Sequence, residues 1–157
     1  MNKSKLIIFV FGFLLFTCAS FCSEIKYSLF PNPYFIMNRV HFEKEIIGKL
    51  PSDLRKIRYV CSIKNISDKI VKAMDIDVYL YDHWGKELAV YRVWQQSRRT
   101  RPGNMANFSI GSKNYAEGIE RYNQLLNTGE MKFKIYKIYF TDGTSEIIDY
   151  DDKTSMR

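Results

Sequence analysis

The stretch with the clearest potential for chemistry is Asp82-His83-Trp84, within VYLYDHWGKEL at 78–88. A carboxylate beside an imidazole could orient a general base of the kind that activates a Ser or Cys nucleophile. The same residues also suit a turn, since an Asp side chain accepts from nearby backbone N–H groups and Gly85 tolerates a positive φ. Alternating apolar and polar residues on both sides favour the turn, which predicts a hairpin with His83 and Trp84 at its exposed tip.

Residues that could hold a metal ion or a cofactor are sparse. The sequence contains two histidines, His41 and His83, whereas a zinc site needs about four Cys, His or carboxylate ligands. Asp75 and Asp77 share one face of a predicted strand without the Gly-bearing loop typical of calcium sites. A further carboxylate group comprises Asp149, Asp151 and Asp152. We therefore predict no catalytic residues, no metal and no cofactor.

A basic cluster with an interleaved aromatic residue is the most suggestive binding signal. It comprises Arg92, Trp94, Arg98, Arg99 and Arg101. Arginines beside an aromatic ring can hold an acidic glycan or a nucleic acid through charge and stacking. The alternative is an arginine-rich surface loop without a ligand.

The N-terminus predicts export. MNKSK supplies two lysines, and an apolar run of 11 residues, 6–16, precedes small residues. This matches a signal peptide over 1–22, and the run is shorter than the roughly 20 residues of a spanning helix. Thr17-Cys18-Ala19 and Ser20-Phe21-Cys22 both fit a cleavage exit, so the cleavage site stays open. A lipid on Cys18 or Cys22 is a second possibility, and only lipidation would place the protein at a membrane. We expect a periplasmic or extracellular protein, for which nucleic acid is not an expected partner.

Composition predicts one folded domain over 23–150, with a frayed tail at 151–157. Hydrophobic residues make up 46% of the chain and can build a core. Without Lys3 and Lys5, the 24 basic residues become 22 against 17 acidic ones, a charge of +5 that permits contact with acidic surfaces. Cys61 lies in an apolar strand pattern and is expected to be buried and inert.

The remaining pattern predicts about seven strands joined by polar turns. In IVKAMDIDVYLY, four apolar residues alternate with two carboxylates and two tyrosines, as in a half-buried strand. Residues 43–57 and 97–104 are predicted as loops, and 113–127 as a short helical insertion. The apolar parity of KFKIYKIYF shifts, which predicts a bulge at Tyr136-Lys137 or burial on both faces. The turn residues are Asn65, Asp82, Gly85, Pro102, Gly103, Asp142 and Gly143. Together these features predict an all-β, immunoglobulin-like antiparallel sandwich.

The stretch SIKNISDKIVKAMDIDVYLYDHWGKEL resembles the FxLYD-type domains of exported bacterial proteins. The matching residues are Asn65, Ser67, Leu80, Tyr81, Asp82 and Gly85. Val78 replaces the Phe of that motif. RPGNMANFSI and KIYKIYFTDGTSEI are similar to later segments of related sandwich domains, so that the resemblance covers roughly 58–148. It implies an immunoglobulin-like sandwich in an envelope or secreted protein and implies no activity.

Three hypotheses about function follow. The first is an exported, non-enzymatic protein that binds an unknown protein partner in the envelope or outside the cell. The second is a module that binds acidic glycan or an anionic membrane surface through the basic cluster. The third, an enzyme built around Asp82 and His83, is the least favoured because no further catalytic group accompanies them.

Overall fold

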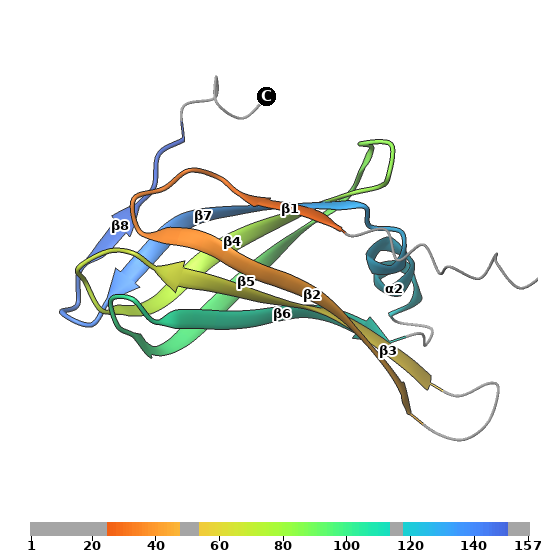
Figure 1. Cartoon of the computed structure of the whole chain (residues 1–157), viewed down its shortest axis with the longest axis horizontal. Coiled ribbons are helices and arrows are strands. Elements are labelled where there is room, and N and C mark those ends of the chain that lie inside the picture. Colours follow the sequence, from red (N-terminus) through yellow and green to blue (C-terminus); the bar gives the residue numbers. More distant parts are fainter. Residues whose placement is uncertain (1–24, 48–53, 114–117, 151–157) are drawn as a thin grey trace, which may run out of the picture.

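Two β-sheets face each other in the computed structural model of the chain, which describes residues 25–47, 54–113 and 118–150 (Figure 1). The five-stranded sheet has the order β1-β7-β4-β5, with β8 also paired to β7, and the three-stranded sheet has the order β2-β3-β6. The strands of the first sheet are β1 (Lys26–Leu29), β7 (Glu130–Phe140), β4 (Val71–Tyr81), β5 (Glu87–Thr100) and β8 (Ser145–Ile147). Those of the second are β2 (Phe35–Ile47), β3 (Leu54–Asn65) and β6 (Met105–Lys113).

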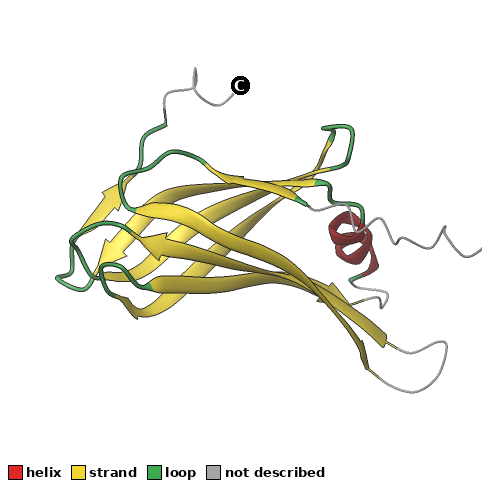
Figure 2. Cartoon of the chain, in the orientation of Figure 1, coloured by secondary structure: helices red, strands yellow, loops and turns green. Residues whose placement is uncertain are grey.

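The predicted all-β sandwich with one short helix is thus confirmed. Every strand pair is antiparallel except β1 with β7. Strands dominate the described residues, whose single helix lies at one end of the sandwich (Figure 2). The expected signal peptide and the tail at 151–157 lie outside the described residues.

The core consists of the inward residues of both sheets. In β4, the predicted apolar face is fully buried, while Asp75, Asp77 and the tyrosines of the other face stay partly exposed. Phe108 on β6 and Phe133 on β7 meet edge to face with ring centroids 5.9 Å apart, which joins the two sheets. Because one face of each strand is buried, a slip of one residue would expose the whole apolar set.

The helix α2 (Ile119–Leu126) lies within the predicted insertion and packs on the three-stranded sheet. Its Tyr122 and Leu125 are buried, and the Tyr59 hydroxyl on β3 donates to the carbonyl of Leu125 at 2.9 Å. The helix therefore contributes apolar residues to the core at the end of the sandwich where the β4–β5 turn also lies (Figure 1).

The parity shift in β7 is a bulge, as predicted. Ile135 pairs with Ile76 on β4, but Lys137 pairs with Asp75, so Tyr136 is the extra residue. Two consecutive side chains, those of Tyr136 and Lys137, consequently stay half-buried outside the core. The bulge adds an aromatic ring and a cation to the outer surface of this sheet.

The loop predicted at 43–57 is wrong, because strand β2 continues to Ile47 and β3 begins at Leu54. Charged residues interrupt the alternation of apolar and polar residues in this segment. Their cross-strand partners explain why the segment still forms strands. Glu43 lies opposite Arg58 and Glu45 opposite Lys56, in opposite-charge pairs that favour an antiparallel ladder. Gly48 and Pro51, which suggested a break, lie outside the described residues.

The loop predicted at 97–104 is also partly wrong, because β5 extends to Thr100 and only the residues after it turn back. Ala73 pairs with Gln96 and Val71 pairs with Thr100. Between these two pairs β5 advances by four residues and β4 by two, so β5 carries two extra residues. Arg99 takes a positive φ of 55° within this irregularity. Such a bulge breaks the alternation on which strand prediction depends.

The predicted turn residues hold their turns. Asp142 Oδ1 accepts from the Thr144 backbone N–H at 2.9 Å, and Gly143 has φ 88°. Gly103, at φ 79°, follows exposed Pro102 and donates its N–H to the carbonyl of Asn65 at 2.8 Å.

Asn65 holds two turns together from a fully buried position. Its Nδ2 donates to the carbonyls of Lys69 at 2.9 Å and Thr100 at 3.0 Å. Its Oδ1 accepts from the backbone N–H of Ser67 at 3.0 Å and from the Ser67 hydroxyl at 2.7 Å. The Asn65 side chain therefore provides hydrogen-bond partners for polar groups of both the β3–β4 turn and the end of β5.

Candidate functional site

The β4–β5 turn uses Asp82 as a structural acceptor. Asp82 Oδ1 accepts from the backbone N–H groups of Trp84 and Lys86, both at 2.9 Å. Gly85 takes φ 85° and donates to the carbonyl of Asp82 at 3.2 Å. The turn predicted from these residues is confirmed, and the Asp82 oxygen that could orient an imidazole is bonded to backbone instead.

His83 and Trp84 lie at the exposed tip, as predicted. Trp84 is 89% exposed. His83 rests against Gly129, where a Cβ would come within 2.6 Å of Nδ1 and 2.8 Å of Cα. The Gly129 N–H donates to the carbonyl of Tyr81 at 2.8 Å, so that close approach joins the turn to the start of β7.

The predicted basic cluster divides between two places, the middle of β5 and the end of β5 with the residue that follows it. Arg92 pairs with Asp77 and Trp94 with Asp75, on the outer face of the five-stranded sheet. Arg99 and Arg101 flank Thr100, whose partner on β4 is Val71. Six residue steps of β4 separate Asp77 from Val71, roughly 20 Å along an extended strand. The side chain of Arg98 lies outside the described part of the structure.

Trp94 lies instead beside residues of β7 that were not predicted as part of a binding site. Its ring centroid is 5.1 Å from that of Tyr139, with the planes at 68°. The Tyr139 hydroxyl donates to Asp75 Oδ2 at 3.3 Å, and Lys137 Nζ lies 4.8 Å from the Tyr139 ring centroid. These contacts extend over three adjacent strands, because the β4 residues opposite the two rings are short: Ala73 lies opposite Tyr139 and Asp75 lies opposite Trp94.

The next row of the same face is built around Arg92. Its Nε donates to Asp77 Oδ1 at 3.0 Å, and this bond raises the pKa of the guanidinium. Its guanidinium carbon lies 4.9 Å from the centroid of the Tyr136 ring. Lys134 Nζ lies 4.9 Å from the ring centroid of Tyr150. Each cation is thus held against an aromatic face.

We call this surface the cation–aromatic platform. It comprises Asp75, Asp77, Arg92, Trp94, Lys134, Tyr136, Lys137 and Tyr139. Burial is the main cause that raises the pKa of the Tyr136 hydroxyl, and the nearby Asp75 adds to it. The Tyr136 hydroxyl therefore stays neutral near pH 7. Alternation could have located Lys134, and the parity shift indicated the bulge at Tyr136 and Lys137, but only the strand order β7-β4-β5 shows that these side chains lie near Trp94.

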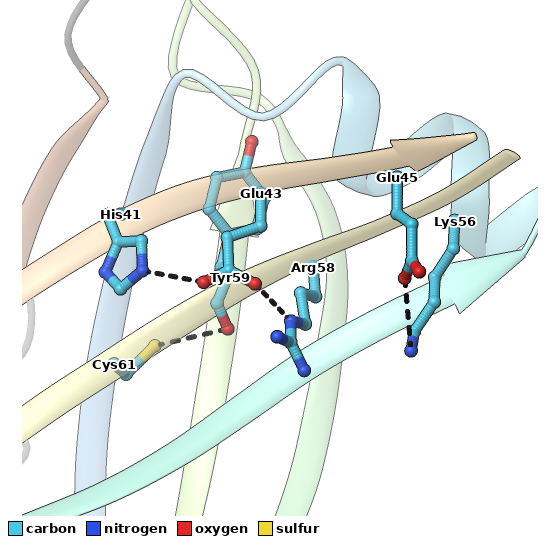
Figure 3. A network of polar contacts seen from close by, with 7 residues as sticks. All are labelled: His41, Glu43, Glu45, Lys56, Arg58, Tyr59 and Cys61. Atoms are coloured by element: carbon cyan, nitrogen blue, oxygen red, sulfur yellow. Dashed lines mark hydrogen bonds and ion pairs between the residues drawn. The ribbon is translucent and has the colours of Figure 1, made fainter. Parts of the chain in front are cut away.

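A second polar cluster lies on the outer face of the three-stranded sheet (Figure 3). Glu43 accepts from Arg58 and contacts His41 Nε2 at 3.0 Å, while Glu45 lies 3.9 Å from Lys56. The bond from Arg58 is the main cause that lowers the pKa of the Glu43 carboxyl. The pairs Glu43–Arg58 and Glu45–Lys56 are cross-strand ion pairs on a partly exposed surface, and the His41–Glu43 contact lies within β2.

Cys61 is buried in the core, as predicted, with Sγ 4.0 Å from the carbonyl oxygen of Tyr59. Burial raises the pKa of its thiol to about 12, so the reactive thiolate is almost absent at neutral pH. Cys18 and Cys22 lie outside the described residues.

Among the described residues, no group of three or more His, Cys, Asp or Glu side chains could hold a metal ion. Asp151 and Asp152 lie outside that range. In the same part of the chain, no helix is long and apolar enough to span a membrane.

Comparison with known proteins gives no family. No protein-family profile matches the chain, and no curated protein matches it. Among solved structures, a structural-genomics target designated SoR45 is similar at 18% identity and a TM-score of 0.39, over 71% of this chain and 81% of that one. A Bordetella pertussis protein provisionally named ApaA is similar at 11% identity and a TM-score of 0.36, over 75% of this chain and 90% of its own.

Proposed function

We propose that this is an exported, non-enzymatic β-sandwich protein that acts by binding a partner in the cell envelope or outside the cell. The observation that carries the proposal is the cation–aromatic platform. Trp94 stays 54% exposed there, although its neighbours are held in place by ring contacts and hydrogen bonds. An exposed ring in an ordered polar setting is characteristic of a binding surface more than of a solvated face.

Export is supported by the N-terminal pattern of two lysines, an apolar run and small residues. The resemblance to FxLYD-type domains of exported proteins points the same way. Cell fractionation with intact-mass measurement tests it. A chain beginning near residue 20 or 23 in the periplasm or medium supports export, and acyl chains on Cys18 or Cys22 support a membrane-tethered form. Full-length protein in the cytoplasm contradicts export.

A crosslinking experiment in the native cell tests the platform as the binding surface. A photoreactive phenylalanine replaces Trp94 in one variant and Ser109 in another. Ser109 is exposed on β6, between core residues Phe108 and Ile110, and therefore faces outward from the other sheet. Discrete adducts at position 94 and none at 109 are expected. Equal adducts, or none at either position, contradict the proposal.

A second candidate surface is the open edge of β2, which would bind a protein by adding a strand. Within the described residues, β2 pairs only with β3, and its other edge can accept an extended partner. Ile36 and Phe42 on this strand are exposed and could contact such a partner. A photoreactive group at Phe42 in the same experiment separates the two: adducts there and none at 94 favour the edge.

A further inference from the structure

We infer that the ligand of the cation–aromatic platform is an acidic polysaccharide, with a sugar ring on Trp94 and ligand carboxylates at Lys134 and Lys137. This inference rests on the proposed function and names the ligand class for the same surface. It relocates the binding site from the arginine cluster of one strand to side chains of β5 and β7.

Charge argues for an acidic ligand. Arg92 is neutralised by Asp77, at 3.0 Å. Lys134 and Lys137 have no carboxylate within 4.0 Å among the residues whose placement is described, and each Nζ is held over a tyrosine ring. Because the rings restrict these ammonium groups before binding, an incoming acid costs less ordering entropy than it would with free lysines.

The exposed ring argues for sugar. Trp94 and Tyr139 meet edge to face, so they do not stack face on face. The Trp94 side chain remains 54% exposed. The C–H face of a pyranose ring packs on such an indole, and its hydroxyls can bond to neighbouring polar groups. Asp75 and the Tyr139 hydroxyl lie directly beside the indole and offer such groups.

Two other polymers fit the platform less well. The centre of a protein–protein interface is depleted in Lys and Asp, whereas the centre of this platform contains both. Single-stranded nucleic acid needs successive open rings on which its bases stack. Here Arg92 covers Tyr136 and Lys137 covers Tyr139, so Trp94 is the one large ring of the platform that remains more than half exposed.

The test measures binding of the full-length protein to immobilised polygalacturonate, a linear polymer of uronic acid. Neutral dextran, polyaspartate and poly(dT) serve as comparison ligands. We expect binding to polygalacturonate that weakens steadily between about 50 and 300 mM NaCl, as screening requires. Dextran should not bind, and polyaspartate, which has charge without sugar rings, should bind at least about tenfold more weakly.

Variants divide the ring contribution from the charge contribution. Trp94→Ala and the double variant Lys134→Gln/Lys137→Gln should each weaken polygalacturonate binding about tenfold. The double variant should also flatten the salt dependence. Trp84→Ala and Lys64→Gln, which change an exposed aromatic in the β4–β5 turn and a cation on β3, should leave binding within about twofold of the wild type. Circular dichroism melting of each variant shows that the fold is retained.

Equal affinity for polyaspartate, a preference for poly(dT), or no effect of Trp94→Ala would each overturn the inference. Crosslinking at position 94 distinguishes a failure of the polysaccharide inference from a failure of the proposed function. Adducts at position 94 with no polygalacturonate binding leave the proposed function standing and refute the polysaccharide. No adducts and no binding refute both.

Discussion

The rings of Trp94 and Tyr139 meet 5.1 Å apart although strand β4 runs between the strands that carry them. On β4, Ala73 lies opposite Tyr139 and Asp75 lies opposite Trp94, so the side chains between the two rings are short. The Asp75 carboxylate also accepts from the Tyr139 hydroxyl. A pair that bridges a strand in this way orders the surface on both sides of it. The platform is therefore formed by three strands together.

This pair predicts measurable coupling. In a double-mutant cycle of Trp94→Ala and Tyr139→Ala, the interaction energy for unfolding should be about 0.5–1.5 kcal/mol, as for other edge-to-face pairs. Urea denaturation of the four proteins measures it. Trp84→Ala with Tyr139→Ala is the matched control, because Trp84 lies in the distant β4–β5 turn, and its effects should add. Additive effects in the first cycle would contradict an ordered pair.

Sequence reasoning succeeded where local chemistry decides the structure. The alternation in β4 predicted its buried face. Asp82 predicted a turn because its side chain can accept from nearby backbone N–H groups, and Gly85 and Gly143 predicted turns because few other residues accept a positive φ. Even the bulge at Tyr136 was visible as a shift in parity.

It failed where a partner strand decides the structure. Glu43 and Glu45 look like loop residues until Arg58 and Lys56 lie opposite them. The site shows the same limit. Arg92 and Trp94 lie together on the platform, but Arg99 lies beyond the bulge in β5, while Tyr139 reaches Trp94 only through the strand order β7-β4-β5. Long-range register carries no local signal in one sequence.

Removal of the Asn65 side chain should destabilise the fold strongly. Asn65→Ala leaves the carbonyl of Thr100 and the N–H and hydroxyl of Ser67 without this partner in a buried or partly buried setting. We expect a loss of about 2–4 kcal/mol in the free energy of unfolding. Asn107→Ala, which removes an exposed amide from β6, should cost less than about 0.5 kcal/mol. Equal costs in urea denaturation would show that Asn65 does not organise the two turns.

The close contact between Gly129 and His83 predicts that Gly129→Ala destabilises the fold and that His83→Ala restores only part of the lost stability. Gly129→Ala places a Cβ 2.8 Å from His83 Cα, a backbone atom that no side-chain rotation can move. The expected cost is about 1–3 kcal/mol, as for other overpacked sites. His83→Ala alone should be nearly neutral, and added to Gly129→Ala it should restore only part of the loss, because Cα remains. Full restoration would mean that the imidazole alone causes the clash.

Glu43 should make the stability of the sandwich sensitive to acid. The bond from Arg58, with a smaller contribution from His41, holds the pKa of the Glu43 carboxyl below its usual value of 4.5. The unfolded state therefore takes up this proton first as pH falls, so the stabilisation is complete above about pH 4.5 and disappears as pH falls through the folded pKa. The difference in unfolding free energy between wild type and Glu43→Gln should be constant from pH 6 to 7 and decline below 4.5. Urea denaturation from pH 3 to 7 measures it. In an Arg58→Gln background the decline should shrink, because the largest cause of the shift is gone, and an unchanged decline there would assign the acid sensitivity to another carboxylate.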